Sequence, residues 1–257
     1  KGYTGDACDS CAPGYKLIAD LLNGTSSCKL AVPATTNMKL WLDADADNTF
    51  TLVDGTNNIT KWASRVGTGV SFDAPLVGNR PKFNDQEAGS AQSAVVFDGT
   101  NDVLAETLNI GGTYSVFIVL RANEVAGSQT ILSAVDANDE LAFWLRTSNN
   151  GGNLDVRQTN GGSENASLSD LSLTERSLVE VHRVGLALTL SVGDSTHSGV
   201  VMADPLTSRD FTLGRRADDN TEPFGGTIHE VIIVSPGLAA NARGAYRDYL
   251  KAKWNLE

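Results

Sequence analysis

Short apolar runs separated by Gly, Asn, Asp and Ser recur along most of the chain, with the length and spacing of β-strands. Tyr114–Leu120 is continuous and apolar, which predicts a strand buried on both faces, and Thr227–Val234 predicts the last strand. Leu178–Val184 and Leu186–Val192 predict a hairpin around Gly185. Because these runs do not alternate with helical patterns, the chain is predicted to be all-β, with an antiparallel sandwich.

The period of the apolar positions changes near the C-terminus. Apolar residues recur at helical spacing from Leu238 to Trp254, which predicts one amphipathic helix over residues 236–254. Ser235 and Pro236 precede this run as a candidate N-cap and a first-turn proline. Residues 160–176 are rich in Ser, Asn and Gly and are predicted to form a long surface loop.

Charge and length narrow the classes of partner. The 257 residues carry a formal net charge of −11, which argues against a nucleic-acid or anionic-membrane partner. No apolar run approaches the roughly 18 residues that a membrane-spanning helix needs, so no direct membrane insertion is expected. The chain opens inside a motif, without a signal peptide, and is interpreted as a processed or excised part of a longer protein.

The cysteines are confined to the start of the chain, at Cys8, Cys11 and Cys28. A zinc site needs a fourth ligand, and no further His or Cys lies nearby, so zinc is disfavoured. The remaining residues contain no cysteine, and the large domain is expected to fold without disulfides.

The segment GYTG-x-x-C-D-S-C-A-P-G-Y around these cysteines resembles the closing half of a laminin-type EGF-like repeat. In that family the last two cysteines pair with each other, so the resemblance implies a Cys11–Cys28 disulfide. It leaves Cys8 to pair with a cysteine upstream of this chain, and it implies an oxidising, extracellular setting. Three N-glycosylation sequons fit that setting and begin at Asn23, Asn58 and Asn165.

A second resemblance covers most of the chain. Its segments, in order, are LWLDA (40–44), ITKW (59–62), NRPKF (79–83), VVFDGTNDVL (95–104) and GGTIHEVIIVS (225–235). Their order is similar to that of laminin-G-like, concanavalin A-like jelly-roll domains. The resemblance implies an antiparallel jelly-roll sandwich with one C-terminal helix, after a small EGF-like segment. The expected domains are a partial EGF-like segment at 1–29, a linker at 30–37 and a laminin-G-like domain at 38–257.

Acidic residues near strand ends make calcium the candidate cofactor. Carboxylates alternate at Asp43, Asp45 and Asp47, and calcium prefers several oxygen ligands on flexible loops. An EF-hand is excluded, because no Gly follows at the sixth position and no Glu at the twelfth. Laminin-G-like domains often hold calcium through loop carboxylates, and the resemblance permits such a site here. Asp98, Asp102 and Glu230 are further candidate ligands.

Simpler interpretations of the same acids stay open. A solvated acidic turn explains residues 43–48 as well as a calcium loop does. Asp98 precedes Gly99, and its side chain is also interpreted as a turn former that bonds its own backbone.

Catalytic signatures are missing from the sequence. No E-x-D-x-x-E run of the laminarinase type occurs, and no G-x-S-x-G surrounds a serine. His182 and His229 lie in predicted strands, where a hydrogen-bonded structural histidine is the favoured interpretation. The chain is therefore expected not to be an enzyme.

Sugar binding needs an exposed aromatic ring beside polar groups. Trp144 and Trp62 are the candidates for such a glycan site, although both lie in strand patterns and are also interpreted as core residues.

Together these observations predict a non-enzymatic extracellular or cell-surface module for adhesion or recognition. Its expected partner is a glycan or a surface protein, with calcium assisting the contact. The alternative is a structural building block of an extracellular filament, appendage or matrix that packs against copies of itself. A weaker alternative is a polysaccharide-cleaving enzyme.

Overall fold

The computed structural model describes residues 13–20, 25–46, 48–67, 69–84, 92–123, 127–148, 152–158, 165–200 and 205–256. The chain divides into two units, one of Lys1–Thr36 with Leu238–Glu257 and the other of Asn37–Gly237. The β-sandwich lies in the second unit. The predicted domain boundaries at 29, 37 and 38 stay a prediction.

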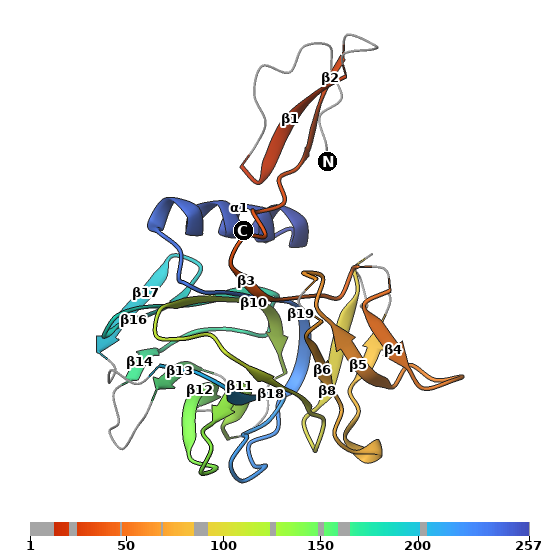
Figure 1. The fold of residues 1–257 in the computed structure, drawn as a ribbon, viewed down its shortest axis with the longest axis vertical. Coiled ribbons are helices and arrows are strands. Elements are labelled where there is room, and N and C mark those ends of the chain that lie inside the picture. Colours follow the sequence, from red (N-terminus) through yellow and green to blue (C-terminus); the bar gives the residue numbers. More distant parts are fainter. Residues whose placement is uncertain are drawn as a thin grey trace. The chain divides into compact units, whose positions relative to one another are not determined.

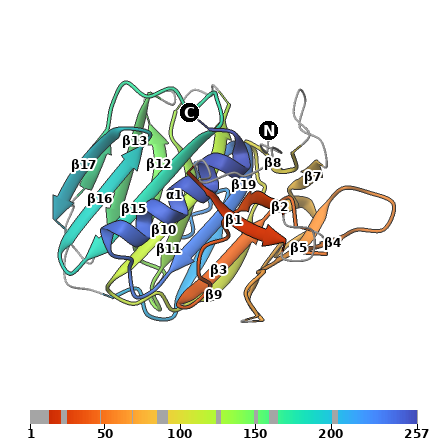
Figure 2. The same ribbon diagram turned by 90° about the horizontal axis from the view of Figure 1, so that it is seen from above.

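Two sheets of antiparallel strands form the second unit, as the sequence predicted (Figure 1). In the described residues, sheet I has eight strands: β17 (Ser195–Val200), β16 (Ala187–Val192), β15 (Ser177–Val184), β10 (Tyr114–Ala122), β19 (Gly225–Val234), β8 (Ala94–Asp98) and β7 (Lys82–Asn84), with β3 (Met38–Asp43) also paired to β19. Figure 2 shows β17, β16, β15 and β10 side by side in that order.

Over the described part of the chain sheet II has nine strands, in the order β14 (Asn165–Leu168), β13 (Asn153–Gln158), β12 (Leu141–Ser148), β11 (Gln129–Val135), β18 (Arg209–Leu213), β9 (Leu104–Leu108), β6 (Ser71–Asp73), β5 (Ile59–Ala63) and β4 (Phe50–Leu52). In Figure 1, one half of sheet II, from β14 to β18, lies below β17, β16 and β10 of sheet I. A single 3₁₀ turn, η1 (Val77–Asn79), precedes β7 within the described residues.

Strand β19 is the centre of sheet I. It pairs with β10 along one side and with β8 and then β3 along the other. Gly226 in this strand has a φ of +156°, and a Cβ there would lie 2.3 Å from the Arg121 carbonyl oxygen. Only glycine therefore fits between β19 and its neighbour β10.

The core fills the space between the sheets and is built by strand alternation. Inward residues such as Val116 and Ile118 of β10 share one apolar cluster with Phe143 and Leu145 of β12. Trp144, which lies between Phe143 and Leu145, and Arg146 consequently point to the outer face of sheet II.

The first unit contains a hairpin and a helix. Strands β1 (Tyr15–Asp20) and β2 (Thr25–Leu30) pair antiparallel, and helix α1 spans Ala240–Trp254. The Tyr246 hydroxyl donates to the Ala34 carbonyl oxygen at 2.7 Å. Among the described residues, no helix is both long and apolar enough to cross a membrane.

Two predictions of local structure need correction. Helix α1 begins at Ala240 rather than at 236, because the Ser235 hydroxyl donates to the Ile110 carbonyl oxygen at 2.7 Å instead of capping a helix. The predicted loop at 160–176 contains strand β14, which pairs with β13. The predicted Cys11–Cys28 disulfide and the environment of Cys8 lie outside the described residues.

Candidate functional site

The outer face of sheet II carries a row of side chains that crosses its central strands. Cross-strand pairing places Arg157 of β13 beside Trp144 of β12, Trp144 beside Ser133 of β11, and Ser133 beside Thr212 of β18. Asn165 of β14 is the register partner of Arg157 at the edge of the sheet. The row is polar except for the indole of Trp144.

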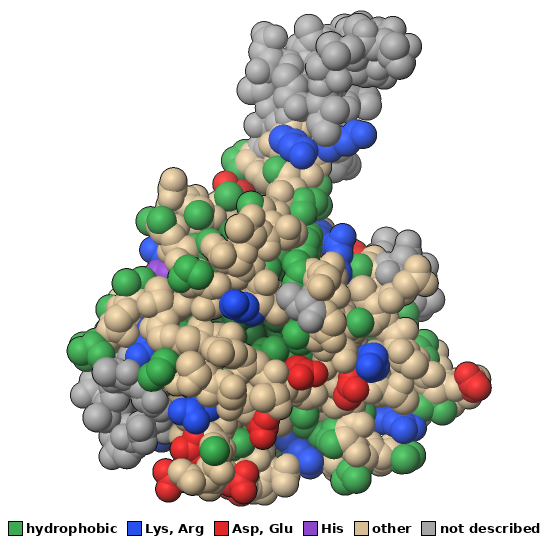
Figure 3. Space-filling model, in the orientation of Figure 1, with side chains coloured by type: hydrophobic (Ala, Val, Ile, Leu, Met, Phe, Trp, Pro, Cys, Tyr) green, Lys and Arg blue, Asp and Glu red, His purple; other side chains and the backbone are tan. Residues whose placement is uncertain are grey.

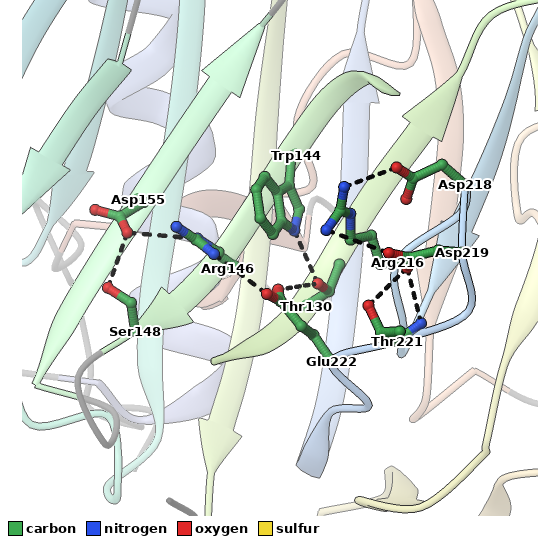
Figure 4. Close-up of polar contacts among 10 residues, drawn as sticks. All are labelled: Thr130, Trp144, Arg146, Ser148, Asp155, Arg216, Asp218, Asp219, Thr221 and Glu222. Carbon is green, nitrogen blue, oxygen red and sulfur yellow. Dashed lines mark hydrogen bonds and ion pairs between the residues drawn. The ribbon is translucent and has the colours of Figure 1, made fainter. Parts of the chain in front are cut away.

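Trp144 lies at the centre of a group of guanidinium ions. The Cζ atoms of Arg146, Arg216 and Arg157 lie 3.9, 4.7 and 5.3 Å from its ring centroid. Arg146 and Arg216 lie on opposite sides of the ring (Figure 4). The indole Nε1 donates to the Thr130 hydroxyl at 2.8 Å, so the ring is held in one orientation.

Arg146 is held by carboxylates from two directions. Its Nε lies 3.5 Å from Asp155 Oδ2, and its Nη1 lies 3.3 Å from Glu222 Oε1. Asp155 also accepts hydrogen bonds from the hydroxyls of Ser148 and Ser167, at 2.8 and 2.6 Å. These contacts form a second polar row, which Figure 4 shows from Ser148 through Asp155 and Arg146 to Glu222.

The loop between β18 and β19 completes the group. The carbonyl oxygen of Arg215 accepts hydrogen bonds from the hydroxyls of Ser133 and Thr212, which fixes the loop over the sheet. Arg216 then pairs with Asp218 at 2.7 Å and with Asp219 at 3.4 Å. We call the residues Trp144, Arg146, Asp155, Arg157, Arg216, Asp218, Asp219 and Glu222 the sheet-II cluster.

One acceptor of the sheet-II cluster is unused. Asp218 Oδ1 is buried and has no hydrogen-bond donor within the described residues. A buried carboxylate oxygen without a donor is costly, so a ligand donor that reaches this atom would supply the missing hydrogen bond.

The predicted calcium ligands fall into two groups. Asp43 and Glu230 are cross-strand partners on β3 and β19, and both are buried. Asp43 forms an ion pair with Arg65, Glu230 accepts a hydrogen bond from Trp41 Nε1 at 2.6 Å, and Asp45 accepts one from the Ser93 N–H. Asp47 lies outside the described residues.

The second group is Asp98 and Asp102. Asp98 Oδ1 accepts hydrogen bonds from the N–H groups of Thr100 and Asn101, which confirms its interpretation as a turn former. Over the described part of the chain, no group of three or more His, Cys, Asp or Glu side chains is arranged to hold a metal ion. Calcium binding stays a prediction.

Asp102 gives this region a pH dependence. Burial raises the pKa of the Asp102 carboxyl to about 6, with a further rise from the charge of Asp98 that the Asp98 N–H bond opposes. The folded state therefore holds a proton that the unfolded chain loses near pH 4. The stabilisation of the folded state by the protonated Asp102 carboxyl is therefore complete below pH 4 and is lost as the pH rises through 6.

We expect Asp102→Asn to raise the unfolding free energy by about 1–3 kcal/mol at pH 7.5 and to change it little at pH 4. The amide can still accept the hydrogen bond that the Asp98 N–H donates. Urea unfolding of both proteins across pH 4–8 measures the difference, with Asp54→Asn in an exposed turn as the matched control. A difference that does not vary with pH would contradict the assignment.

The two candidate tryptophans differ in their environment. Trp62 is fully buried and stacks on Phe50 with a centroid distance of 5.4 Å, so its proposed role as an exposed glycan platform is wrong and the core interpretation is confirmed. Trp144 is 5% exposed on the outer face, where guanidinium groups cover its ring. An open stacking surface at Trp144 is therefore also wrong, although its place in a glycan site stays a prediction.

Two histidines in strands are hydrogen-bonded, and two of the three sequons lie in the described residues. His182 Nδ1 bonds the Ser115 hydroxyl at 2.7 Å and His229 Nδ1 bonds the Ser93 carbonyl oxygen at 3.0 Å, which confirms hydrogen-bonded strand histidines. Asn58 forms an isolated bridge with Lys82, and Asn165 lies in β14. Asn23 lies outside the described residues, and glycosylation stays a prediction.

The arginines are the residues that sequence reasoning missed. The alternation in LAFWLR (141–146) places Trp144 and Arg146 on one face, so this part of the signal was present. Arg157 and Arg216 join them through strand pairing and loop placement, which no local pattern indicates.

No protein-family model matches the chain, and no curated protein matches it. Among solved structures, the Trypanosoma rangeli sialidase in complex with sialic acid matches with a TM-score of 0.56 and 13% identity, over 88% of this chain and 34% of the sialidase. This chain thus spans about a third of that enzyme.

Two further structures match over different lengths. Domain 4 of AbnA, an extracellular arabinanase from Geobacillus stearothermophilus in complex with arabinotriose, has a TM-score of 0.50 and 13% identity, over 83% of this chain and 98% of that one. Domains LG4-5 of the mouse laminin α1 chain have a TM-score of 0.47 and 13% identity, over 56% and 41% of the two chains.

Proposed function

We propose that this chain is a non-enzymatic recognition module that binds a glycan through the outer face of sheet II. The observation that carries the proposal is the sheet-II cluster, in which an indole, guanidinium donors and a buried unused carboxylate oxygen lie together. Sugar hydroxyls both donate and accept hydrogen bonds, so they suit a surface that offers arginine donors and the Asp218 acceptor.

A binding role suits the carboxylates of the cluster better than a catalytic one. Asp155 and Glu222 both contact Arg146, and Asp219 contacts Arg216, so each is held as the partner of a cation. General acid catalysis needs a carboxyl group whose pKa is raised by an apolar environment. Arabinotriose in the matching arabinanase domain supports the view that this type of sandwich accommodates a glycan.

The test is a glycan-array screen followed by calorimetric titration of the best ligand. We expect Asp218→Asn to weaken binding about 10- to 100-fold, because the variant exchanges a charged acceptor for a neutral one. Thr189→Ala, at a partly exposed position of sheet I, is the control and should bind as the unmodified chain does. Equal affinity of both variants would contradict the proposed site.

The same titration separates this site from a calcium-dependent one. Because the described acids of the cluster contact arginines, we expect the affinity to be unchanged when EDTA is present. Loss of binding in EDTA would place the glycan at a calcium site instead.

A further inference from the structure

The arginines of the sheet-II cluster differ in whether a carboxylate lies beside them to neutralise their charge. Arg146 contacts Asp155 and Glu222, and Arg216 contacts Asp218 and Asp219, so each of these guanidinium groups faces two carboxylates. Arg157, within the described part of the chain, forms no ion pair with any carboxylate. Its Cζ lies 5.3 Å from the centroid of Trp144, and its Nε is buried without an acceptor in the described residues.

Arg215, on the loop after β18, also lacks a carboxylate partner in the described residues. Its carbonyl oxygen is fixed above Ser133 and Thr212. Its side chain is half-buried, and this loss of hydration lowers the pKa of its guanidinium group.

An arginine in this position keeps its charge, because its pKa is too high for deprotonation in proteins. A half-buried guanidinium without an anion has lost part of its hydration, and contact with an aromatic ring replaces less of it than an anion does. The fork of N–H donors matches the two oxygens of a carboxylate and also the oxygens of a sulfate. A neutral hydroxyl would offer one acceptor and no compensating charge.

The net charge of −11 of the whole chain does not prevent an anion from binding at Arg157. Figure 3 shows Lys and Arg interspersed among Asp and Glu on the side of the molecule in view, which is an edge of the sandwich and not the outer face of sheet II. At physiological ionic strength exposed charges farther than about 8 Å are largely screened. Local pairing therefore decides the affinity, and Asp155, Glu222, Asp218 and Asp219 are already in contact with other arginines.

We infer that the ligand of the sheet-II cluster is an anionic sugar, and that Arg157 binds its carboxylate or sulfate group. This inference rests on the proposed function, since it assumes that a glycan occupies the outer face of sheet II. The oxyanion would contact Arg157, while hydroxyls of the same sugar reach Asp218 and the neighbouring arginines. A neutral glycan would leave Arg157 without its partner and would bind more weakly.

The test compares three oligosaccharides of equal length by calorimetric titration with the full chain. Hyaluronan carries carboxylates only, keratan sulfate carries sulfates only, and desulfated keratan is neutral. We expect at least one charged ligand to bind about tenfold or more tightly than the neutral one. Which of the two binds more tightly distinguishes a carboxylate from a sulfate as the recognised group.

Arg157→Gln should lower the affinity for the charged ligand about tenfold more than the affinity for the neutral one, so that the preference is lost, whereas Arg157→Lys should retain part of it. Lys61→Gln is the matched control, because Lys61 is a cation on strand β5 of the same sheet and pairs with Asp73. Thermal unfolding confirms that each variant is folded.

Two results would overturn the inference. Equal affinity of the unmodified chain for the three ligands, or an equal loss for charged and neutral ligands in Arg157→Gln, would refute it while the proposed function stands. Binding to none of the three also counts against it. The proposed function fails separately, if the glycan array shows no ligand or if Asp218→Asn binds unchanged.

Discussion

Replacing Trp62 with alanine is expected to lower the unfolding free energy of the sandwich by about 3–5 kcal/mol. The indole is fully buried and stacks on Phe50, which in turn contacts Phe83 at a centroid distance of 4.6 Å. Its removal leaves a cavity between β4, β5 and their neighbours that the rigid strands cannot close. Urea unfolding at pH 7 measures the loss.

Trp62→Phe is the informative control for this substitution. Phenylalanine keeps the stacking and removes the indole Nε1, which is buried and has no acceptor in the described residues. We therefore expect a much smaller loss than for alanine. Glycan affinity should be unchanged in both variants at temperatures where they are folded, and a loss of affinity in folded Trp62→Phe would return this residue to the binding site.

Replacing Arg65 with methionine is expected to lower the unfolding free energy by about 3 kcal/mol. Arg65 is the cation that contacts Asp43, whose side chain is 2% exposed, and its guanidinium also lies 4.2 Å from the centroid of Trp41. Methionine keeps apolar contact with the indole but leaves the Asp43 carboxylate buried without this cation. Chemical unfolding at neutral pH measures the effect.

The double variant Arg65→Met with Asp43→Asn separates the ion pair from packing. Because the amide carries no charge, we expect the double variant to recover most of the lost stability. An equal loss in the single and double variants would show that Arg65 stabilises the fold through its contact with Trp41 instead.

The strands with strong local signals were predicted well. Tyr114–Leu120 became β10 (Tyr114–Ala122), and the hairpin around Gly185 formed where the left-handed φ of that glycine, +59°, permits the turn. Strand β14 was missed because its four residues lie within a polar stretch that carries no alternating pattern. Its strand conformation is supported by pairing with β13, which is a tertiary effect.

The candidate site was predicted only in part, for a similar reason. Trp144 was found because a tryptophan near polar residues is visible in the sequence, but the arginines that cover it come from β12, β13 and the loop after β18. Calcium binding by Asp43 and Asp98 stays a prediction, and the turn at Asp98 was foreseen, but the ion pair between Asp43 and Arg65 was not. Composition and spacing do not indicate which partner a charged group finds in space.

The position of β19 has a consequence for biosynthesis. Trp41 on β3 and Glu230 on β19 are hydrogen-bonded although they are 189 residues apart in sequence. Strands β8 and β10 also pair with β19, which is synthesised after both of them. While the chain emerges from the ribosome, sheet I has no central strand, and the edges of β3, β8 and β10 stay unpaired. The sandwich must therefore assemble after translation has passed residue 234, and until then its nascent edges are open to aggregation.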